Sequence, residues 1–227
     1  MNRSALVATL VVLFVAGLGI GVVSSAALPA SSTQATMTST TTVTTTNQTV
    51  ASSPYVLTLV ITTNNIFNST VGDQPAYYVL GPSGLESSAN ISIPAHRLIK
   101  LVIVNYDDGA ANLTNPQYSN VSGTQNGVIS VVNNDNVNSS QGTSGINING
   151  GETVSSVSPD NIAHTFTVPQ LNLNIPVPPS SVVTAYFTTN STGTFTWFCF
   201  TQCGSGATGT EGAMSTPGWM TGSVVVS

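Results

Sequence analysis

From residue 54 to the end, the sequence consists of short apolar or alternating runs that Gly, Pro, Asn and Asp interrupt. Runs of this length, rich in β-branched and aromatic residues, are typical of strands. The predicted strands are residues 55–62, 76–80, 87–93, 97–105, 128–132, 164–168, 171–175, 182–187, 195–198 and 223–226. No segment after the N-terminal apolar run shows a sustained helical period. The run at 87–93 is weak. Some eight or nine short strands with turn signals between them predict an all-β, Greek-key sandwich.

Charge is scarce in this chain. Charged residues make up 5% of the 227 residues, and the formal net charge is −5 at pH 7. An average soluble domain has about 25% charged residues. Beyond residue 30, Arg97 and Lys100 are the only basic residues. So few cations cannot neutralise a run of phosphates, which excludes nucleic acid as a partner.

An apolar run covers residues 5–23, directly behind Arg3 and its neighbouring serine. A run of about 18 or more apolar residues can span a bilayer, and a leading positive charge favours a cytoplasmic N-terminus. We therefore expect a signal anchor over residues 1–30, which makes the protein single-pass in the cell membrane with its folded part on the extracytoplasmic side. The small residues at 25–27 leave a cleaved signal peptide, and hence a secreted protein, as the alternative.

The anchor is followed by a linker and one folded domain. Residues 31–53 are almost wholly Ser, Thr, Ala, Gln and Val, which cannot bury a core and predict an exposed Ser/Thr-rich stalk. The domain is then expected to cover residues 54–227. Within it, residues 133–163 are interpreted as a long polar insertion, and Asp107-Asp108-Gly109 as a solvated turn.

Residues suited to metal binding gather towards the C-terminus. Cys199-Phe-Thr-Gln-Cys203-Gly-Ser-Gly206 holds the only two cysteines, directly after the aromatic strand 195–198. His164 begins a predicted strand upstream, and Met220 precedes the last strand. Thiolate, imidazole and a weak thioether are the ligands that copper electron-transfer sites use. The sequence therefore predicts a copper site formed by His164, Cys199, Cys203 and Met220, on loops at one end of the sandwich.

The order of these residues resembles the cupredoxin superfamily, and most closely the copper domain of heme–copper oxidase subunit II. The histidine followed by an aromatic strand and the Cys-x-x-x-Cys-Gly-x-Gly loop are similar to that family over residues 90–227, most specifically over 160–227. The resemblance implies a cupredoxin fold, bound copper, electron transfer in a respiratory chain, and oxidase subunits or another redox protein in the membrane as partners.

One ligand of the family is missing. The family has a second histidine directly after the Gly-x-Gly, where this chain has Ala207, and no histidine follows His164. The loop up to Met220 is also longer than the family's, and it offers Met214 or Glu211 as a replacement donor. His96 begins the strand 97–105, and eight residues at roughly 3.3 Å each would place it about 25 Å from the metal end, so we expect a surface turn residue.

Three interpretations of the cysteine loop follow. The loop binds one copper with reduced ligation; or Cys199 and Cys203 form a disulfide and the domain is metal-free; or the loop is an interaction surface in an oxidase that takes electrons from quinol. We expect a membrane-anchored extracytoplasmic cupredoxin in respiratory electron transfer. The alternative is a metal-free accessory or structural subunit of a quinol-type terminal oxidase or of the cell surface.

Catalysis by this chain alone is not expected. With a single interior histidine the sequence offers no Ser/His/Asp arrangement, and it has no glycine-rich phosphate loop between a strand and a helix. If the protein contributes to an enzyme, it does so as a subunit II-like component of a terminal oxidase.

Overall fold

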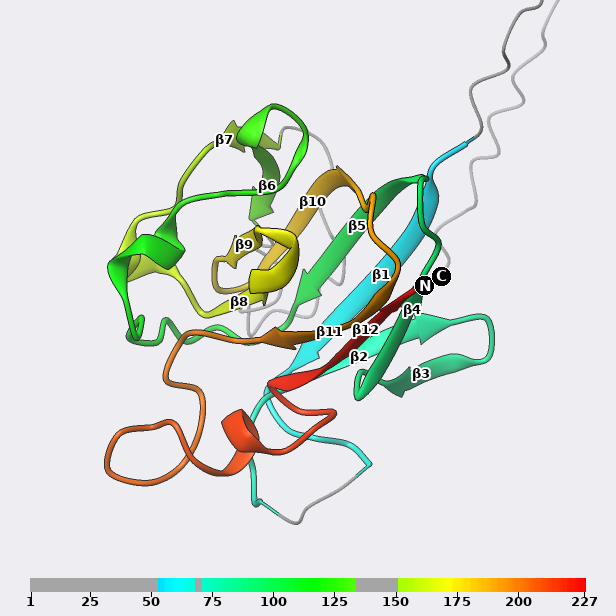
Figure 1. Ribbon diagram of the computed structural model, residues 1–227. Coiled ribbons are helices and arrows are strands. Elements are labelled where there is room, and N and C mark those ends of the chain that lie inside the picture. The colour runs from blue at the N-terminus through cyan, green and yellow to red at the C-terminus, as the bar shows by residue number, and fades with distance from the viewer. Residues whose placement is uncertain (1–52, 68–70, 134–150) are drawn as a thin grey trace, which may run out of the picture. The chain divides into compact units, whose positions relative to one another are not determined.

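Two β-sheets packed face to face make up the part of the chain that the computed structural model describes, residues 53–67, 71–133 and 151–227 (Figure 1). The seven-stranded sheet has the order β3 (Gly84–Ser87), β2 (Ala76–Gly81), β1 (Tyr55–Thr62), β5 (Leu98–Asn105), β10 (Ser181–Thr188), β6 (Ile129–Asn133) and β7 (Glu152–Val154). The five-stranded sheet has the order β4 (Asn90–Ile93), β12 (Thr221–Val226), β11 (Gly193–Phe198), β8 (His164–Val168) and β9 (Leu173–Val177). The all-β sandwich expected from the sequence is confirmed.

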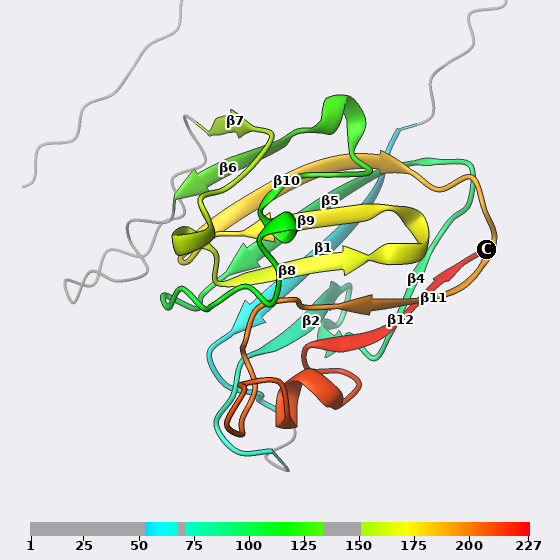
Figure 2. The ribbon, with the colours of Figure 1, turned by 60° about the vertical axis from the view of Figure 1, so that its left-hand side comes forward.

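The chain crosses between the sheets several times, as Greek-key folds do. The β1–β5 and β4–β12 pairs are parallel, and all other strand pairs are antiparallel. Short 3₁₀ turns punctuate the loops: η1 (Pro116–Ser119), η2 (Gln125–Gly127), η3 (Pro159–Asn161), η4 (Pro169–Leu171) and η5 (Gly212–Ser215). β11 runs antiparallel to β8, so it leads towards the start of β8, and β5 ends at the same end of the sandwich (Figure 2).

The core lies between the sheets and follows the period of two along each strand. In β5 the inward residues Ile99, Leu101 and Ile103 are fully buried, while their neighbours are half-exposed. β8 and β9 are buried on both faces, because the segment around η1 covers their outer side (Figure 2). There Asn174 Nδ2 donates to the carbonyl oxygens of Tyr118 and Asn120, at 3.0 and 2.6 Å.

Three aromatic rings form the centre of the core. Tyr77 and Trp197 meet edge to face with ring centroids 5.1 Å apart, and Phe166 lies 5.5 Å from Trp197 and 6.2 Å from Tyr77. They come from β2, β8 and β11, so the cluster ties the larger sheet to the smaller. The indole Nε1–H of Trp197 donates to Ser88 O at 3.0 Å.

The strand predictions differ from the structure in a few places. The run 87–93 is divided between β3 and β4, which belong to different sheets. The strand expected at 171–175 is β9 at 173–177, because Pro169 starts a 3₁₀ turn and Asn172, with φ 53°, completes it in the left-handed conformation. The polar stretch 133–163 contains β7, which pairs with β6.

The predicted anchor and the stalk as far as residue 52 lie outside the described residues, as do residues 134–150 of the polar insertion. Within the described ranges, none of the helices has the length and apolar character needed to cross a bilayer.

The close packing of β12 against β11 yields a stability prediction. A Cβ on Gly222 would stand 2.6 Å from Trp197 Nε1 and 2.7 Å from Ser88 O, the two atoms of the indole hydrogen bond. We expect Gly222→Ala to lower the free energy of unfolding by about 1–3 kcal/mol, as overpacking of a core does. Denaturant unfolding would measure it. Ser223→Ala, on the outward side of the same strand, is the control and should change stability by less than about 0.5 kcal/mol; equal effects of both substitutions would contradict the packing described.

Candidate metal centre

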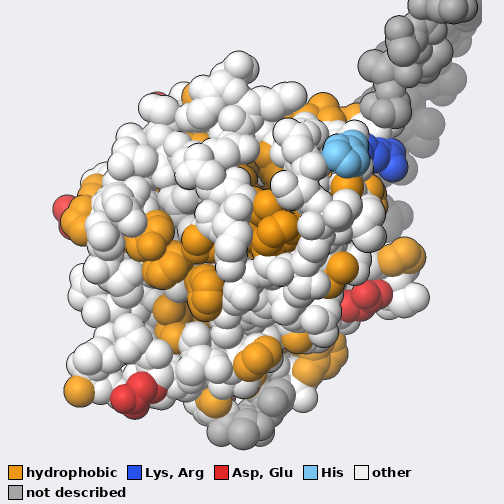
Figure 3. Space-filling view, viewed as in Figure 1, with side chains coloured by type: hydrophobic (Ala, Val, Ile, Leu, Met, Phe, Trp, Pro, Cys, Tyr) orange, Lys and Arg blue, Asp and Glu red, His pale blue; other side chains and the backbone are white. Residues whose placement is uncertain are grey.

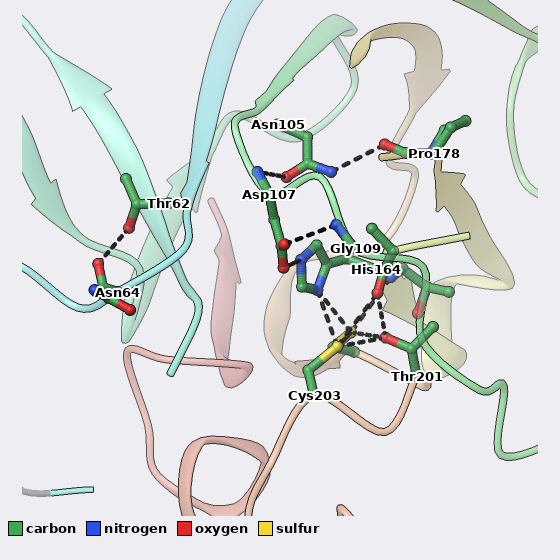
Figure 4. A network of polar contacts seen from close by, with 12 residues as sticks. Thr62, Asn64, Asn105, Asp107, Gly109, His164, Pro178, Thr201 and Cys203 are labelled. Atoms are coloured by element: carbon green, nitrogen blue, oxygen red, sulfur yellow. Dashed lines mark hydrogen bonds and ion pairs between the residues drawn. The ribbon is translucent and has the colours of Figure 1, made fainter. Parts of the chain in front are cut away.

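Three segments meet at one end of the sandwich and bring their polar side chains together. β8 begins with His164, the loop after β11 carries Cys199 and Cys203, and the loop after β5 carries Asp107 (Figure 4). His164 and Cys199 are buried, and Cys203 is half-buried. The structure therefore brings together three of the four residues that the sequence predicted for the site, and adds a fourth that it did not.

The histidine nitrogen and the two sulfurs form one cluster. His164 Nδ1 lies 3.1 Å from Cys203 Sγ and 3.9 Å from Cys199 Sγ, and the two sulfurs are 4.0 Å apart. Both cysteines are free thiols. All three atoms lie within 4.8 Å of one another, and among the described His, Cys, Asp and Glu residues they are the one group that could hold a metal ion.

Asp107 fixes the orientation of the imidazole ring. Its Oδ2 lies 2.9 Å from His164 Nε2, and Gly109 N donates to its Oδ1 at 3.1 Å. Asn105 holds the loop from the other side: its Oδ1 accepts from Asp107 N at 3.0 Å, and its Nδ2 donates to Pro178 O at 2.9 Å (Figure 4). Because Nε2–H donates to the carboxylate, Nδ1 is the nitrogen directed at the sulfurs.

Two threonines complete the surroundings of the sulfurs. The Thr201 hydroxyl lies 2.7 Å from Cys203 Sγ and 3.0 Å from Cys199 Sγ, and it donates to Ala163 O at 2.8 Å. Thr165 N donates to Cys199 Sγ at 3.4 Å. The Thr165 hydroxyl in turn accepts from Phe200 N at 2.9 Å, so the histidine strand and the cysteine loop hold each other in register.

The charges of the cluster depend on these contacts. Burial alone would lower the pKa of His164, but hydrogen bonds to Asp107 and Cys199 and their negative charges raise it to about 9. Burial also opposes ionisation of Cys199, yet hydrogen bonds from Cys203, His164 and Thr201 lower its pKa well below that of an ordinary thiol. The hydrogen bond to Cys199, followed by burial, raises the pKa of Cys203.

The negative charge of the metal-free cluster therefore lies on Cys199. Cys203 Sγ is nearer to the imidazole, but Cys199 Sγ is the sulfur that accepts from a backbone amide, Thr165 N. Of the two thiols, Cys199 is therefore the one that ionises more readily, beside an imidazole whose pKa is raised. A buried thiolate stabilised by an imidazolium is poised to bind a metal or to act as a nucleophile.

Met220 lies beside the cysteine loop through its backbone. Its carbonyl accepts from Cys199 N at 2.8 Å, and its N donates to Ala213 O at 3.2 Å. Its side chain is fully buried. These bonds fix the position of Met220 relative to Cys199, and the thioether as a ligand stays a prediction.

The loop between Cys203 and Met220 forms a small projecting hairpin. Ser205 and Glu211 pair through both of their backbone hydrogen bonds, at 3.1 Å each, and Ala207 is exposed in the turn between them. Glu211 is exposed and does not belong to the described metal-ligating group. Met214 is half-buried, and its Cγ would stand 2.8 Å from a Cβ placed on Gly204, next to Cys203. Both replacement donors considered from the sequence therefore lie against the cysteine loop, since the Glu211 carboxylate would meet a Cβ placed on Gly206.

His96 lies in an exposed turn, as predicted. It has a positive φ of 54°, and its N donates to Thr189 O at 2.8 Å, beside the start of β5. Asp107, at the other end of β5, is the residue that the sequence interpretation placed wrongly. It was expected in a solvated turn, but its side chain is 20% exposed and pairs with His164. The Asn-x-Asp-x-Gly spacing at the end of β5 was the available signal for a turn that fixes a carboxylate.

The sequence matches no protein-family model, and it matches no curated protein. Solved structures that it resembles are cupredoxins. The periplasmic domain of subunit II of cytochrome oxidase from Bradyrhizobium japonicum is 13% identical, with a TM-score of 0.31 over 75% of this chain and 83% of that one. Auracyanin B is 12% identical, with a TM-score of 0.28 over 78% and 93%. Reduced rusticyanin is 14% identical, with a TM-score of 0.27 over 78% and 82%. Likenesses this distant carry no argument about function, which has to come from the site itself.

The ion pair of the metal-free site is open to measurement. Asp107→Asn removes the carboxylate that raises the pKa of His164, so the imidazolium is lost at a lower pH and the pKa of Cys199 rises. We expect the thiolate ultraviolet absorbance of the metal-free protein to be smaller in this variant at neutral pH. In the unaltered chain it should stay level up to about pH 9, where His164 titrates. Asp108→Asn, at the exposed neighbour, is the matched control; the same loss in both variants would contradict the assignment.

Proposed function

We propose that this chain binds copper through His164, Cys199 and Cys203 and carries single electrons. One observation carries the proposal: an imidazole nitrogen and two sulfurs, largely shielded from water, lie within 4.8 Å of one another. Soft thiolates with one imidazole favour copper, zinc or iron–sulfur chemistry over hard cations, and copper cycles between oxidation states on such donors. Met220, buried at the end of the same loop, is the proposed weak axial donor.

The protein holds these donors in a rigid and largely buried environment. Asp107 holds the ring of His164 from the side away from the sulfurs, which is the usual arrangement behind a metal-binding histidine. Thr165 N donates to Cys199 Sγ, where hydrogen bonds tune the reduction potential. Strands of both sheets fix the loops, so the donors need little rearrangement when the oxidation state changes.

The proposed setting is the outer face of a respiratory membrane, as a subunit II-like partner of a terminal oxidase. The apolar run at 5–23 would anchor the chain, and the stalk would let the domain reach its redox partner. Figure 3 shows only scattered charged side chains on the face drawn, which agrees with a composition of 5% charged residues. Steering by opposite charge would be weak on such a surface, and a tether replaces it by raising the local concentration of the domain.

A metal-free role is the second candidate function, and the distance between the two cysteine sulfurs supports it. The sulfurs of Cys199 and Cys203 are 4.0 Å apart in an exported domain, where an oxidising compartment favours disulfides. In that case the domain would serve as an accessory or structural subunit of an oxidase or of the cell surface. The missing histidine at Ala207 is compatible with either role.

Copper titration of the full chain, reduced and free of metal, separates the two roles. We expect a saturable thiolate-to-copper absorption that His164→Gln weakens severely, because the only imidazole of the cluster is lost. His96→Gln is the matched control, since it removes the other histidine of the chain, and it should leave the titration unchanged. No absorption in the unaltered chain, together with no free thiols on titration of the protein as isolated, would reject the copper role and support the disulfide.

A further inference from the structure

The few charged side chains of the folded domain differ in sign between its two ends. β1 and β5 are parallel, and both run from the end where the described chain begins, here called the stalk end, to the end with the candidate metal centre, here called the metal end. Arg97 and Lys100, the only Lys or Arg among the described residues, lie at the start of β5, and the exposed His96 precedes them. Figure 3 shows the blue and pale blue side chains together at one edge of the face drawn. The stalk end is therefore the basic end.

The acidic residues lie mostly at the metal end. β2, β7 and β8 begin there, since β2 starts opposite the end of β1 and β7 is paired with the second half of the hairpin that β6 opens. Of the seven acidic residues in the described ranges, six lie at or before the start of these strands, after β5, or in the hairpin after Cys203: Asp73, Asp107, Asp108, Glu152, Asp160 and Glu211. Glu86 is the exception, and it pairs with Val79, which is opposite the core residue Leu59, so its side chain is on the inner side of the larger sheet.

Lys100 stands in a row with two exposed side chains of apolar or aromatic character. Val56 of β1 and Tyr186 of β10 are both in register with it, so the three side chains lie side by side on the outer face of the larger sheet. Val56 is 57% exposed and Tyr186 is 36% exposed. Lys and Tyr combine an apolar stem or ring with a polar tip, which suits them to the boundary between hydrocarbon and water.

Arg97 lies where the chain enters the domain. Its Nε and Nη2 donate to Ser53 O at 3.2 and 2.8 Å, and its guanidinium carbon is 5.9 Å from the centre of the Tyr55 ring. A guanidinium has several N–H donors, so others are left for a phosphate oxygen. The basic residues and the point where the proposed stalk joins the domain therefore share one end of the sandwich.

We propose that the stalk end is a lipid-binding surface, on which Arg97, Lys100 and Tyr186 contact a bilayer with anionic phosphate headgroups while the metal end points away from it. The inference rests on the proposed membrane setting, and it does not depend on copper. The anionic surface attracts the stalk end and repels the acidic metal end, so both ends favour the same orientation. The domain would then present its candidate metal centre away from the bilayer.

The proposed tether makes a weak contact sufficient. A basic side chain near an anionic surface contributes about fivefold to binding, and two of them are too few to hold a free protein. A flexible chain as long as residues 31–53 has an end-to-end distance of roughly 25–30 Å. The anchor would therefore keep the stalk end close to the bilayer at a high effective concentration.

Lys100 is the only lysine of the chain, which makes it a reporter of this contact. We expect an uncharged, water-soluble acylating reagent to modify Lys100 of the full chain about fivefold more slowly in vesicles of phosphatidylcholine with phosphatidylglycerol than in phosphatidylcholine alone. Mass spectrometry of the peptide that contains Lys100 separates this reaction from that of the N-terminal amine. High salt screens the surface charge and should abolish the difference.

Two variants alter the contact, and a third serves as the control. Arg97→Gln and Tyr186→Ser should each reduce the protection of Lys100. Asp73→Lys places a lysine at an exposed position of the metal end. The introduced lysine should react at the same rate in both kinds of vesicle, while Lys100 of the same molecule stays protected.

Equal rates at Lys100 in both kinds of vesicle, or equal slowing at the lysine introduced at position 73, would overturn the inference. Protection that survives both high salt and Arg97→Gln would do the same, because it would not depend on the basic residues. Failure of the full chain to float with phosphatidylcholine vesicles would reject the membrane setting, and this inference with it. Copper titration of the same variants is a separate measurement, so the proposed copper site is tested independently.

Discussion

The 2.9 Å hydrogen bond between Asp107 and His164 is the interaction on which the rest of the site depends. It joins the end of β5 in the larger sheet to the start of β8 in the smaller one, so it also closes the sandwich at this end. Because Asp107 accepts the hydrogen bond from Nε2–H, Nδ1 is directed at the two sulfurs. Without it, a fully buried imidazole would have no charged partner outside the sulfur cluster, and burial would lower its pKa.

Hydrogen bonds hold the cysteine loop beside that imidazole. Cys199 is held through its backbone by Met220, and Thr201 contacts both sulfurs while it is bound to Ala163, the residue before the histidine. The hairpin that carries Ala207 projects away from this unit into solvent. The contacts around the one imidazole and the two sulfurs therefore do not depend on the residues of that hairpin turn.

Much of this could be predicted from the sequence, and the limits have a physical cause. Short β-branched and aromatic runs separated by turn residues indicated the sandwich, because they are local signals. The two cysteines share one loop, and His164 was added from its place in the order of the family that the chain resembles. Asp107 was missed because its partner is 57 residues away and only the packing of the two sheets brings them together.

X-ray absorption at the copper edge of the full chain, loaded with one equivalent of copper, tests the donor set most directly. The geometry described here predicts a first shell dominated by sulfur together with the scattering pattern of one imidazole. His164→Gln should lose the imidazole pattern, and His96→Gln should keep it. A first shell of nitrogen and oxygen alone, or an imidazole pattern that survives His164→Gln, would contradict a copper centre formed by His164, Cys199 and Cys203.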